Sequence, residues 1–172
     1  MTSPMPAKPS SKGRTKATAC AEYWFRQRFH VPAEWAFRWC IDFSAYDWMH
    51  SGGTGSRAVT WLAPHTVILD DAFPAPGGRR VRKVKMVQVY PETKSWVSTH
   101  IVGPRHHSQF RYVIEAHGKN ASSLRFQGRE LRWDGPRLTP AQNRQLASEL
   151  RAEDSALWER FAEEMERDYR SA

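Results

Sequence analysis

The 172-residue chain is 40% hydrophobic and 12% aromatic, which excludes a mainly disordered protein and is enough for one domain with a substantial core. It contains no apolar run of the roughly 18 residues that a membrane-spanning helix needs, and its first residues lack the apolar segment of a secretory signal. We therefore expect a soluble, cytoplasmic protein without stable membrane insertion. The formal net charge of +8 at pH 7 leaves nucleic acid open as a partner.

The chain begins with a basic segment, residues 1–19, that is rich in Pro, Ser and Ala and contains no acidic residue. Such a composition is typical of a disordered tail, so we expect the folded domain to span residues 20–172. Any affinity for nucleic acid is expected to reside largely in this tail and to fade with salt. Cys20 and Cys40 lack the spacing of a zinc site and are interpreted as inert thiols.

Residues 22–31 alternate between apolar or aromatic and polar side chains, and this pattern predicts the first strand. Pro32 ends the strand and suits the first turn of a helix that continues to about Phe43. Within this helix Trp35, Trp39 and Phe43 recur at helical spacing, and we interpret them as core residues.

A second short helix is predicted directly after the first, because Ser44 is followed three residues later by Asp47, as at a helix N-cap. Three large side chains lie in or beside it: Tyr46, Trp48 and Met49. They either line the mouth of a pocket or belong to the core. The Gly-rich residues 50–57 that follow lack the Lys of a phosphate-binding loop, so they are interpreted as a connector.

Six strand-like runs follow, divided by short turns that suit antiparallel hairpins. The runs cover residues 57–62, 65–73, 79–90, 95–102, 108–117 and 123–133. Thr139 and Pro140 then open a long helix that runs to about Tyr169 and has one broad apolar stripe. An antiparallel sheet with one apolar face needs a cover, and only this helix is long enough. The order predicts an α+β fold with a curved, seven-stranded antiparallel sheet wrapped around the C-terminal helix.

This order, together with the residues FHVPAEWAFRWCIDFSAYDWM at positions 29–49, resembles the START-like, or helix-grip, superfamily. That superfamily includes polyketide cyclases, lipid-transfer proteins and Hsp90-activator-like proteins. The resemblance covers roughly residues 22–169 and implies that residues 20–172 form a START-like ligand-binding domain. It further implies an apolar or amphipathic ligand held between the sheet and the long helix, without a cofactor. Some members carry such ligands, whereas others catalyse cyclisation or dehydration.

Alternation divides the basic strand at residues 79–90 into two rows. One row contains Val84, Met86, Gln88 and Tyr90, and the other contains Lys83 and Lys85. We expect the first row to face inward, because the other row carries the two lysines. Three arginines are expected to join the lysines on the outer face: Arg111, Arg125 and Arg129. We interpret this basic row as solvated charge that discourages aggregation, with phosphate contact as the alternative.

A cavity is expected between the sheet and the long helix, with apolar walls and a few polar groups. Its expected ligand-binding residues are Phe25, Phe29, Trp48, Met86, Gln88, Tyr90, Tyr112, Phe126, Glu130, Asp154, Leu157 and Phe161. Asp154 falls within the apolar arc of the helix, so it either faces the cavity or reaches solvent and pairs with Arg151. In the first case Asp154, Glu130 and Tyr112 form the polar end of the pocket and are the candidate catalytic residues.

Three functions are compatible with these features. The first is binding or carrying an apolar or amphipathic small molecule. The second is a cofactor-free polyketide cyclase or dehydratase, which needs in addition an acid or base that touches the ligand. The third is a basic module that contacts nucleic acid or a protein partner. No metal site is expected, because the adjacent His106 and His107 would point in opposite directions in an extended chain.

Overall fold

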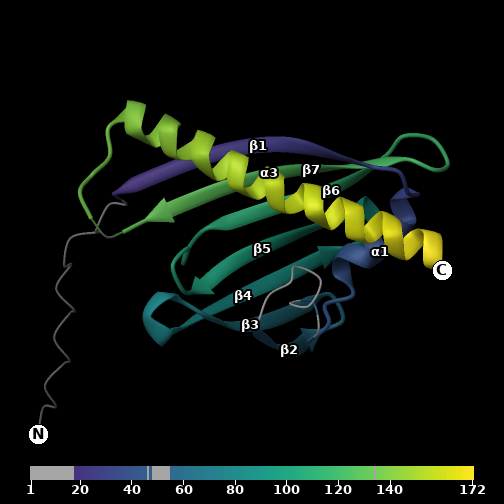
Figure 1. Ribbon diagram of the computed structural model, residues 1–172, viewed down its shortest axis with the longest axis horizontal. Coiled ribbons are helices and arrows are strands. Elements are labelled where there is room, and N and C mark those ends of the chain that lie inside the picture. The colour runs from purple at the N-terminus through teal and green to yellow at the C-terminus, as the bar shows by residue number, and fades with distance from the viewer. Residues whose placement is uncertain (1–17, 46, 48–54, 134) are drawn as a thin grey trace, which may run out of the picture.

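The computed structural model describes residues 18–45, 47, 55–133 and 135–172. Within these residues, seven strands form one antiparallel sheet (Figure 1). The strands are β1 (Ala19–Phe29), β2 (Ser56–Ala63), β3 (Thr66–Pro74), β4 (Arg80–Tyr90), β5 (Ser95–Val102), β6 (Gln109–Ala116) and β7 (Ser122–Arg132). Their order is β1-β7-β6-β5-β4-β3-β2, so the first strand pairs with the last, and β1 and β2 form the edges. The predicted seven-stranded sheet is confirmed.

Two α-helices and two 3-10 turns complete the described elements: α1 (Ala33–Ile41), α3 (Pro140–Ser171), η1 (Pro76–Gly78) and η2 (Pro91–Thr93). Helix α3 runs diagonally across one face of the sheet and packs against β1 (Figure 1). Helix α1 contacts β6, β7 and α3. The predicted long C-terminal helix is confirmed, whereas half of the predicted second short helix, Tyr46, Trp48 and Met49, lies outside the described residues.

The first turn of α3 follows from local chemistry. The Thr139 hydroxyl accepts a hydrogen bond from the backbone N–H of Gln142 at 3.3 Å, and the Gln142 side chain accepts one from the backbone N–H of Thr139 at 2.9 Å. This reciprocal capping box satisfies two free donors, and Pro140 has no N–H to satisfy. The buried face of the helix contains Leu146, Leu150, Asp154, Trp158, Ala162 and Met165. One carboxylate therefore lies within the stripe that α3 turns toward the sheet.

The aromatic residues of α1 pack against the core, as predicted. The Trp35 ring lies 5.1 Å from that of Tyr169, and the Trp39 ring lies 6.2 Å from that of Phe161, measured between ring centroids. Both partners belong to the C-terminal half of α3. These contacts fix α1 against α3 at one end of the sheet.

The predicted facing of β4 is wrong. Lys83 and Lys85 lie on the inner face, the face that α3 covers, where they line the space between the sheet and the helix. The other row of the strand contains Met86, Gln88 and Tyr90. The inner face accommodates the lysines because it also holds Asp71, which is completely buried and lies 3.4 Å from the Lys85 ammonium. An inward lysine row is stable where a buried carboxylate faces it.

The predicted basic row on the outer face is not formed by the described residues. Its two lysines are on the inner face, and two of its arginines are paired with acids. Arg125 lies 3.1 Å from Glu115, and Arg129 lies 3.3 Å from Glu22. The outer face of β1, β6 and β7 therefore alternates in charge.

Ala19, which the sequence assigned to the tail, is the first residue of β1 and pairs with Arg132. The pairing joins backbone groups, so the strand begins three residues before the alternating run at residues 22–31, and it ends at Phe29. No helix in the described part of the chain is both long and apolar enough to cross a membrane.

Candidate ligand-binding cavity

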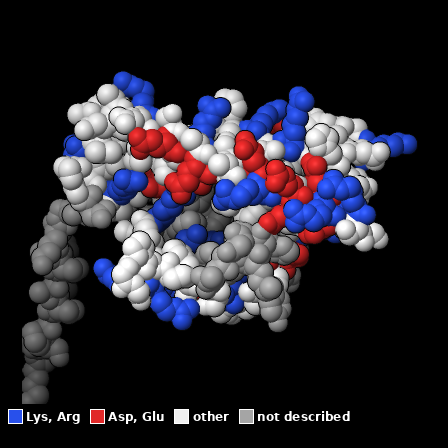
Figure 2. Space-filling model, in the orientation of Figure 1, with Lys and Arg blue, Asp and Glu red and all other residues white. Residues whose placement is uncertain are grey.

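A cavity of about 640 Å³ lies between the inner face of the sheet and α3. Its walls come from α1, from strands β2 to β7, from the β5–β6 loop and from α3. Figure 2 shows this side of the molecule hollowed below α3, with Lys and Arg atoms inside the hollow. The volume falls within the roughly 300–1,000 Å³ that is usual for small-molecule sites.

A row of aromatic rings crosses four strands, and its rings on β5, β6 and β7 form part of the cavity wall. Trp96 of β5 stacks on Tyr112 of β6 with 4.7 Å between ring centroids, and Tyr112 meets Phe126 of β7 edge-on at 5.1 Å. Phe25 of β1 stacks on Phe126 from behind at 4.6 Å. Trp158 of α3 closes the row from above, 5.8 Å from Tyr112. Each ring in the sheet is the cross-strand partner of the next, so the register of the sheet builds this wall.

Asp154 faces the cavity, which is the first of the two predicted alternatives. It is 8% exposed and accepts a hydrogen bond from the Tyr23 hydroxyl. Its other carboxylate oxygen lies 3.5 Å from Nη1 of Arg105. Arg151, the partner in the second alternative, instead places its guanidinium over the Trp24 ring at 5.8 Å. A buried carboxylate needs such partners, and Tyr23 and Arg105 supply them.

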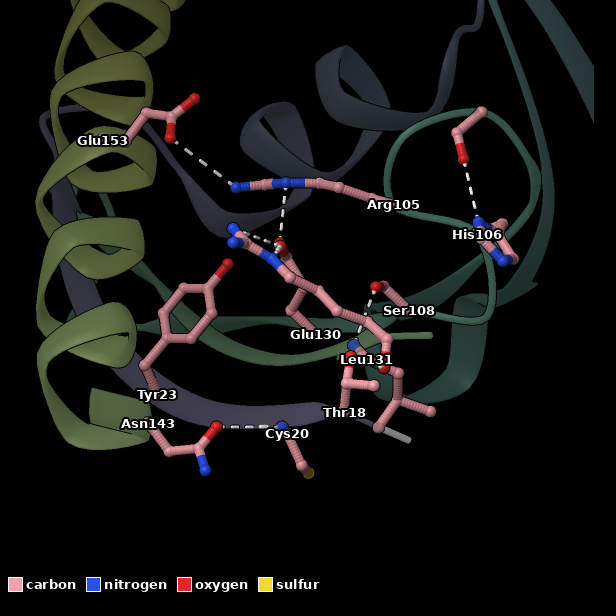
Figure 3. A network of polar contacts seen from close by, with 12 residues as sticks. Thr18, Cys20, Tyr23, Arg105, His106, Ser108, Glu130, Leu131, Asn143 and Glu153 are labelled. Atoms are coloured by element: carbon pink, nitrogen blue, oxygen red, sulfur yellow. Dashed lines mark hydrogen bonds and ion pairs between the residues drawn. The ribbon is translucent and has the colours of Figure 1, made fainter. Parts of the chain in front are cut away.

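Arg105 joins Asp154 to Glu130, which is only 3% exposed. The Nε atom of Arg105 lies 2.8 Å from Oε2 of Glu130, and Nη2 of Arg105 lies 3.7 Å from Oε2 of Glu153 on the outer side of α3. Figure 3 shows the Arg105 side chain reaching between Glu130 on β7 and Glu153 on α3, with Tyr23 beside it. This arginine thus links the sheet to the helix at one end of the cavity.

The β5–β6 loop positions Arg105 by passing close over β4. Gly103 in this loop has φ +109°, and a Cβ there would lie 2.8 Å from the Arg82 carbonyl oxygen. Only glycine fits such an approach with such a dihedral angle. His106 then donates its backbone N–H to the Gly103 carbonyl at 3.1 Å and closes the turn. No pattern in the sequence pointed to Arg105, because its role depends on where this turn directs its side chain.

A second charged group lies on β2, β3 and β4. Arg57 binds Asp71 through two hydrogen bonds, with Nε 2.6 Å from Oδ1 and Nη2 3.3 Å from Oδ2, and it also pairs with Asp47. Lys85 approaches Asp71 from the other side, at 3.4 Å. Burial alone would raise the pKa of Asp71, but the hydrogen bonds from Arg57 and the charge of Lys85 outweigh it and lower the pKa. Asp71 therefore stays a carboxylate.

Two lysines and a histidine near Asp71 have lowered pKa values. Burial, followed by the charge of Lys83, lowers the pKa of Lys85 to about 7, although Asp71 opposes the shift. Burial also lowers the pKa of Lys83, with the charge of Arg105 acting in the same direction. Burial and the charges of Lys83 and Lys85 lower the pKa of His100 to about 3, so this imidazole is neutral near pH 7.

Several polar groups of the cavity have no hydrogen-bond partner among the described residues. The Ser98 hydroxyl and Nδ1 of His100 are buried without one. No hydrogen bond is found for the Tyr112 hydroxyl either, and burial, followed by the charge of Asp154, raises the pKa of Tyr112 well above its usual range. A protonated phenol without a partner among the described residues can donate to a ligand.

The structure brings together some of the predicted residues and separates others. Those that line the cavity are Tyr112, Phe126, Asp154, Leu157 and Phe161. Phe25 and Phe29 are buried behind the wall, where Phe29 lies 6.4 Å from Trp158. Glu130 lies behind Arg105, and Trp48 lies outside the described residues. Met86, Gln88 and Tyr90 belong to the row that points away from the cavity, so their predicted place in it is wrong.

One missed residue had a signal in the sequence. Asp71 shares its alternating row with Val67 and Leu69, both of which are buried. A carboxylate on an apolar row is the same pattern that singled out Glu130 and Asp154, and it would have identified Asp71. An inward-facing Asp71 on β3 would in turn have predicted inward-facing lysines on the neighbouring strand β4, because a buried carboxylate needs cationic partners.

No protein-family model and no curated protein sequence matches the chain, but solved structures do. The Zhui aromatase/cyclase from a Streptomyces species superposes with a TM-score of 0.68 at 13% identity, over 86% of this chain and 94% of that one. A START superfamily protein from Mycobacterium smegmatis superposes with a TM-score of 0.62 at 16% identity, over 85% of this chain and 97% of that one. The chain has the helix-grip fold. Norcoclaurine synthase from Thalictrum flavum, solved with dopamine and hydroxybenzaldehyde, also has this helix-grip architecture, with a TM-score of 0.63 at 10% identity over 95% of both chains.

At these identities the likeness concerns the helix-grip fold alone. Within the described residues, no group of three or more His, Cys, Asp or Glu side chains is arranged to hold a metal ion. The polar groups that line the cavity are carboxylates, ammonium and guanidinium groups, hydroxyls, a thiol, indole N–H groups and a neutral imidazole.

Proposed function

We propose that this protein binds and carries an apolar or amphipathic small molecule in the cavity between the sheet and α3. The observation that supports this function is the cavity itself, which has about 640 Å³ of space and is lined by a wall of aromatic rings together with polar and charged groups. Sites with this composition take up ligands that bury most of their surface. The structures of the same fold include one solved with dopamine and hydroxybenzaldehyde, which are small aromatic molecules.

The aromatic wall supplies the affinity in this proposal. Each 100 Å² of apolar ligand surface removed from water contributes about 2.5 kcal/mol before the cost of association. The rings of Trp96, Tyr112 and Phe126 are held by cross-strand neighbours, so little side-chain freedom remains to be lost when a ligand enters. A carrier needs this surface and no reacting group.

The test is a fluorescence titration with N-phenyl-naphthylamine (NPN), an uncharged apolar probe. Ser98→Phe fills the cavity without removing a hydrogen bond found in the structure, and we expect it to weaken NPN binding by about tenfold or more. Val97→Phe is the matched control, because Val97 is the neighbouring residue of β5 and points to the outer face.

Both variants are first shown to unfold cooperatively. Tight NPN binding by the wild type and by Val97→Phe, together with weak binding by Ser98→Phe, supports the proposal. If the wild type fails to bind NPN, or if both variants bind it equally well, the cavity is not a ligand site.

A second candidate function, a cofactor-free cyclase or dehydratase, is favoured by one observation. The Asp154 carboxylate and the Tyr112 hydroxyl line the same cavity, so a base and a hydrogen-bond donor can reach one ligand. Asp154 would take a proton from a carbon next to a carbonyl group, and Tyr112 would stabilise the enolate oxygen.

Asp154→Asn separates the two candidates because it keeps the shape of the side chain and removes its charge. A change in NPN affinity alone supports the carrier. Loss of turnover of a poly-β-ketone substrate with retained binding supports the enzyme.

A further inference from the structure

We propose that the ligand of this cavity is an organic acid, and that its anionic group is held by Lys83 and Lys85 on the inner face of β4. The proposal rests on the proposed function and goes beyond it by naming the chemical class of the ligand. It also assigns the two ends of the cavity different tasks, with the aromatic rings binding the apolar body and the β4 lysines binding the acid.

The first support is a cation that the described residues leave without an acidic partner. Arg57 and Lys85 share the single carboxylate of Asp71, and Arg57 also pairs with Asp47. None of the ion pairs among the described residues includes Lys83, although this lysine is half-buried and lines the cavity. With both lysines protonated, the described residues of this group therefore hold three cations and two carboxylates. A cation withdrawn from water is stabilised by an anion, and the cavity is the place from which one can approach.

The second support is a pair of neutral polar groups beside the lysines. His100 is the cross-strand partner of Lys85, and Ser98 precedes it by two residues on the same face of β5. The Ser98 hydroxyl and Nδ1 of His100 are buried in the cavity wall, and neither has a hydrogen-bond partner in the part of the chain that the structure describes. Leaving such groups unsatisfied is unfavourable, and a carboxylate has enough lone pairs to accept bonds from an ammonium and a hydroxyl together.

The remaining cation at this end of the cavity is already occupied. Arg105 lies next to Glu130, Glu153 and Asp154, so a ligand anion gains nothing there. This leaves β4 as the cationic surface for an incoming acid.

The register of the sheet also fixes the size of the ligand. Val89 of β4 pairs with Trp96, where the aromatic row begins, and it lies four residues beyond Lys85. Four residues of a strand span about 13 Å. A ligand with its acid at Lys85 therefore places its apolar body against the aromatic rings that begin at Trp96 and line the cavity.

Proton uptake should accompany binding. Lys85 is faced by Asp71 of β3, Arg57 of β2, Lys83 of its own strand and His100 of β5, with Arg105 and Asp154 lining the same end of the cavity. With a pKa of about 7, Lys85 is only partly charged near neutral pH. An anion beside it favours the protonated form, so the acid binds more tightly below pH 7 than above it.

The test compares two probes with the same ring skeleton, NPN and anilinonaphthalene sulfonate (ANS), which differs from NPN by one sulfonate group. NPN binding tests whether the cavity takes up an apolar molecule. The ratio of the ANS and NPN affinities tests whether the cavity binds an anionic group. We expect Lys83→Met/Lys85→Met to weaken ANS binding by about tenfold or more and to change NPN binding little. Lys119→Met is the control for the loss of a lysine charge, because it removes one from an exposed turn outside the cavity.

A measurement on the wild type keeps the inference testable if the double variant does not fold. From about pH 6 to about pH 8 the protonated fraction of a group with a pKa of about 7 falls roughly tenfold. ANS affinity should therefore fall by up to about tenfold over this range, with NPN affinity unchanged. The inference of an acidic ligand is overturned if NPN binds tightly and the ratio of the ANS and NPN affinities changes neither with pH nor with the lysine substitutions. The proposed binding function of the cavity would still hold in that case. Absence of NPN binding would overturn the proposed function itself.

Discussion

Arg105→Met should destabilise the protein strongly, because it leaves two buried carboxylates without their shared cation. Glu130 is 3% exposed and Asp154 is 8% exposed, and Arg105 lies 2.8 Å from the first and 3.5 Å from the second. After the substitution Glu130 keeps only Arg132, at 3.3 Å, and Asp154 keeps only the Tyr23 hydroxyl. Removing one partner of a buried ion pair costs about 3–5 kcal/mol, and we expect a loss of this size.

Arg82→Met is the matched control. Arg82 binds Asp70 through hydrogen bonds of 2.6 and 2.9 Å, but the two side chains are 64% and 33% exposed. Exposed ion pairs of this kind contribute less than about 1 kcal/mol. The expected difference between the two variants in the free energy of unfolding therefore comes from the burial of the acidic partners and hardly from the number of contacts.

The assay is urea unfolding followed by circular dichroism, with the free energy of unfolding obtained by linear extrapolation. A second variant, Arg105→Met/Glu130→Gln, removes one of the stranded charges and should recover about 1 kcal/mol or more relative to Arg105→Met. Equal losses for Arg105→Met and Arg82→Met, or no recovery in the double variant, would refute the claim that Arg105 compensates buried charge.

Three further predictions concern other parts of the fold. His100 has a pKa of about 3, below its ordinary value of about 6.5, so the stability that its neutral form contributes is complete above pH 6.5 and is lost as the pH falls toward 3. In this window the free energy of unfolding of the wild type should fall by up to about 1.4 kcal/mol per pH unit relative to that of His100→Gln. Parallel plots of the free energy of unfolding against pH for the two proteins would contradict this assignment. Gly128→Ala places a Cβ 2.6 Å from the Tyr23 ring, so we expect a loss of about 1–3 kcal/mol in thermal unfolding, and an unchanged midpoint would show that Tyr23 is free to move. Deletion of residues 1–17, which the sequence assigns to a basic tail, should leave the free energy of unfolding unchanged, and loss of a cooperative transition would show that the domain needs this segment.

The sheet and the long helix could be predicted because their patterns are local. Alternating side chains and turn residues mark each strand, and the capping pair Thr139 and Gln142 marks the start of α3. The position of Asp154 on the inner side of α3 was also accessible, because helical geometry alone places it within the apolar arc.

The polar end of the cavity could not be predicted as fully, because it depends on contacts between distant segments. Alternation divides β4 into two rows but does not say which one faces inward. Lys83 and Lys85 were predicted to face outward because burying a lysine is unfavourable. In the structure this cost is offset by Asp71 on the neighbouring strand. Arg105 lies in a loop without periodicity, so its pairing with Glu130 appears only once the sheet is assembled.

The central claim, that the space below α3 is the ligand site, is tested most directly by an isotope-filtered NOE spectrum of the NPN complex. The account predicts contacts from the ligand protons to Leu69, Phe126 and Trp158, which line the cavity. A second groove, on the outer face of the sheet, is lined by residues that include Trp24 and Val97. Contacts to those two residues, with none to the cavity wall, would contradict the account.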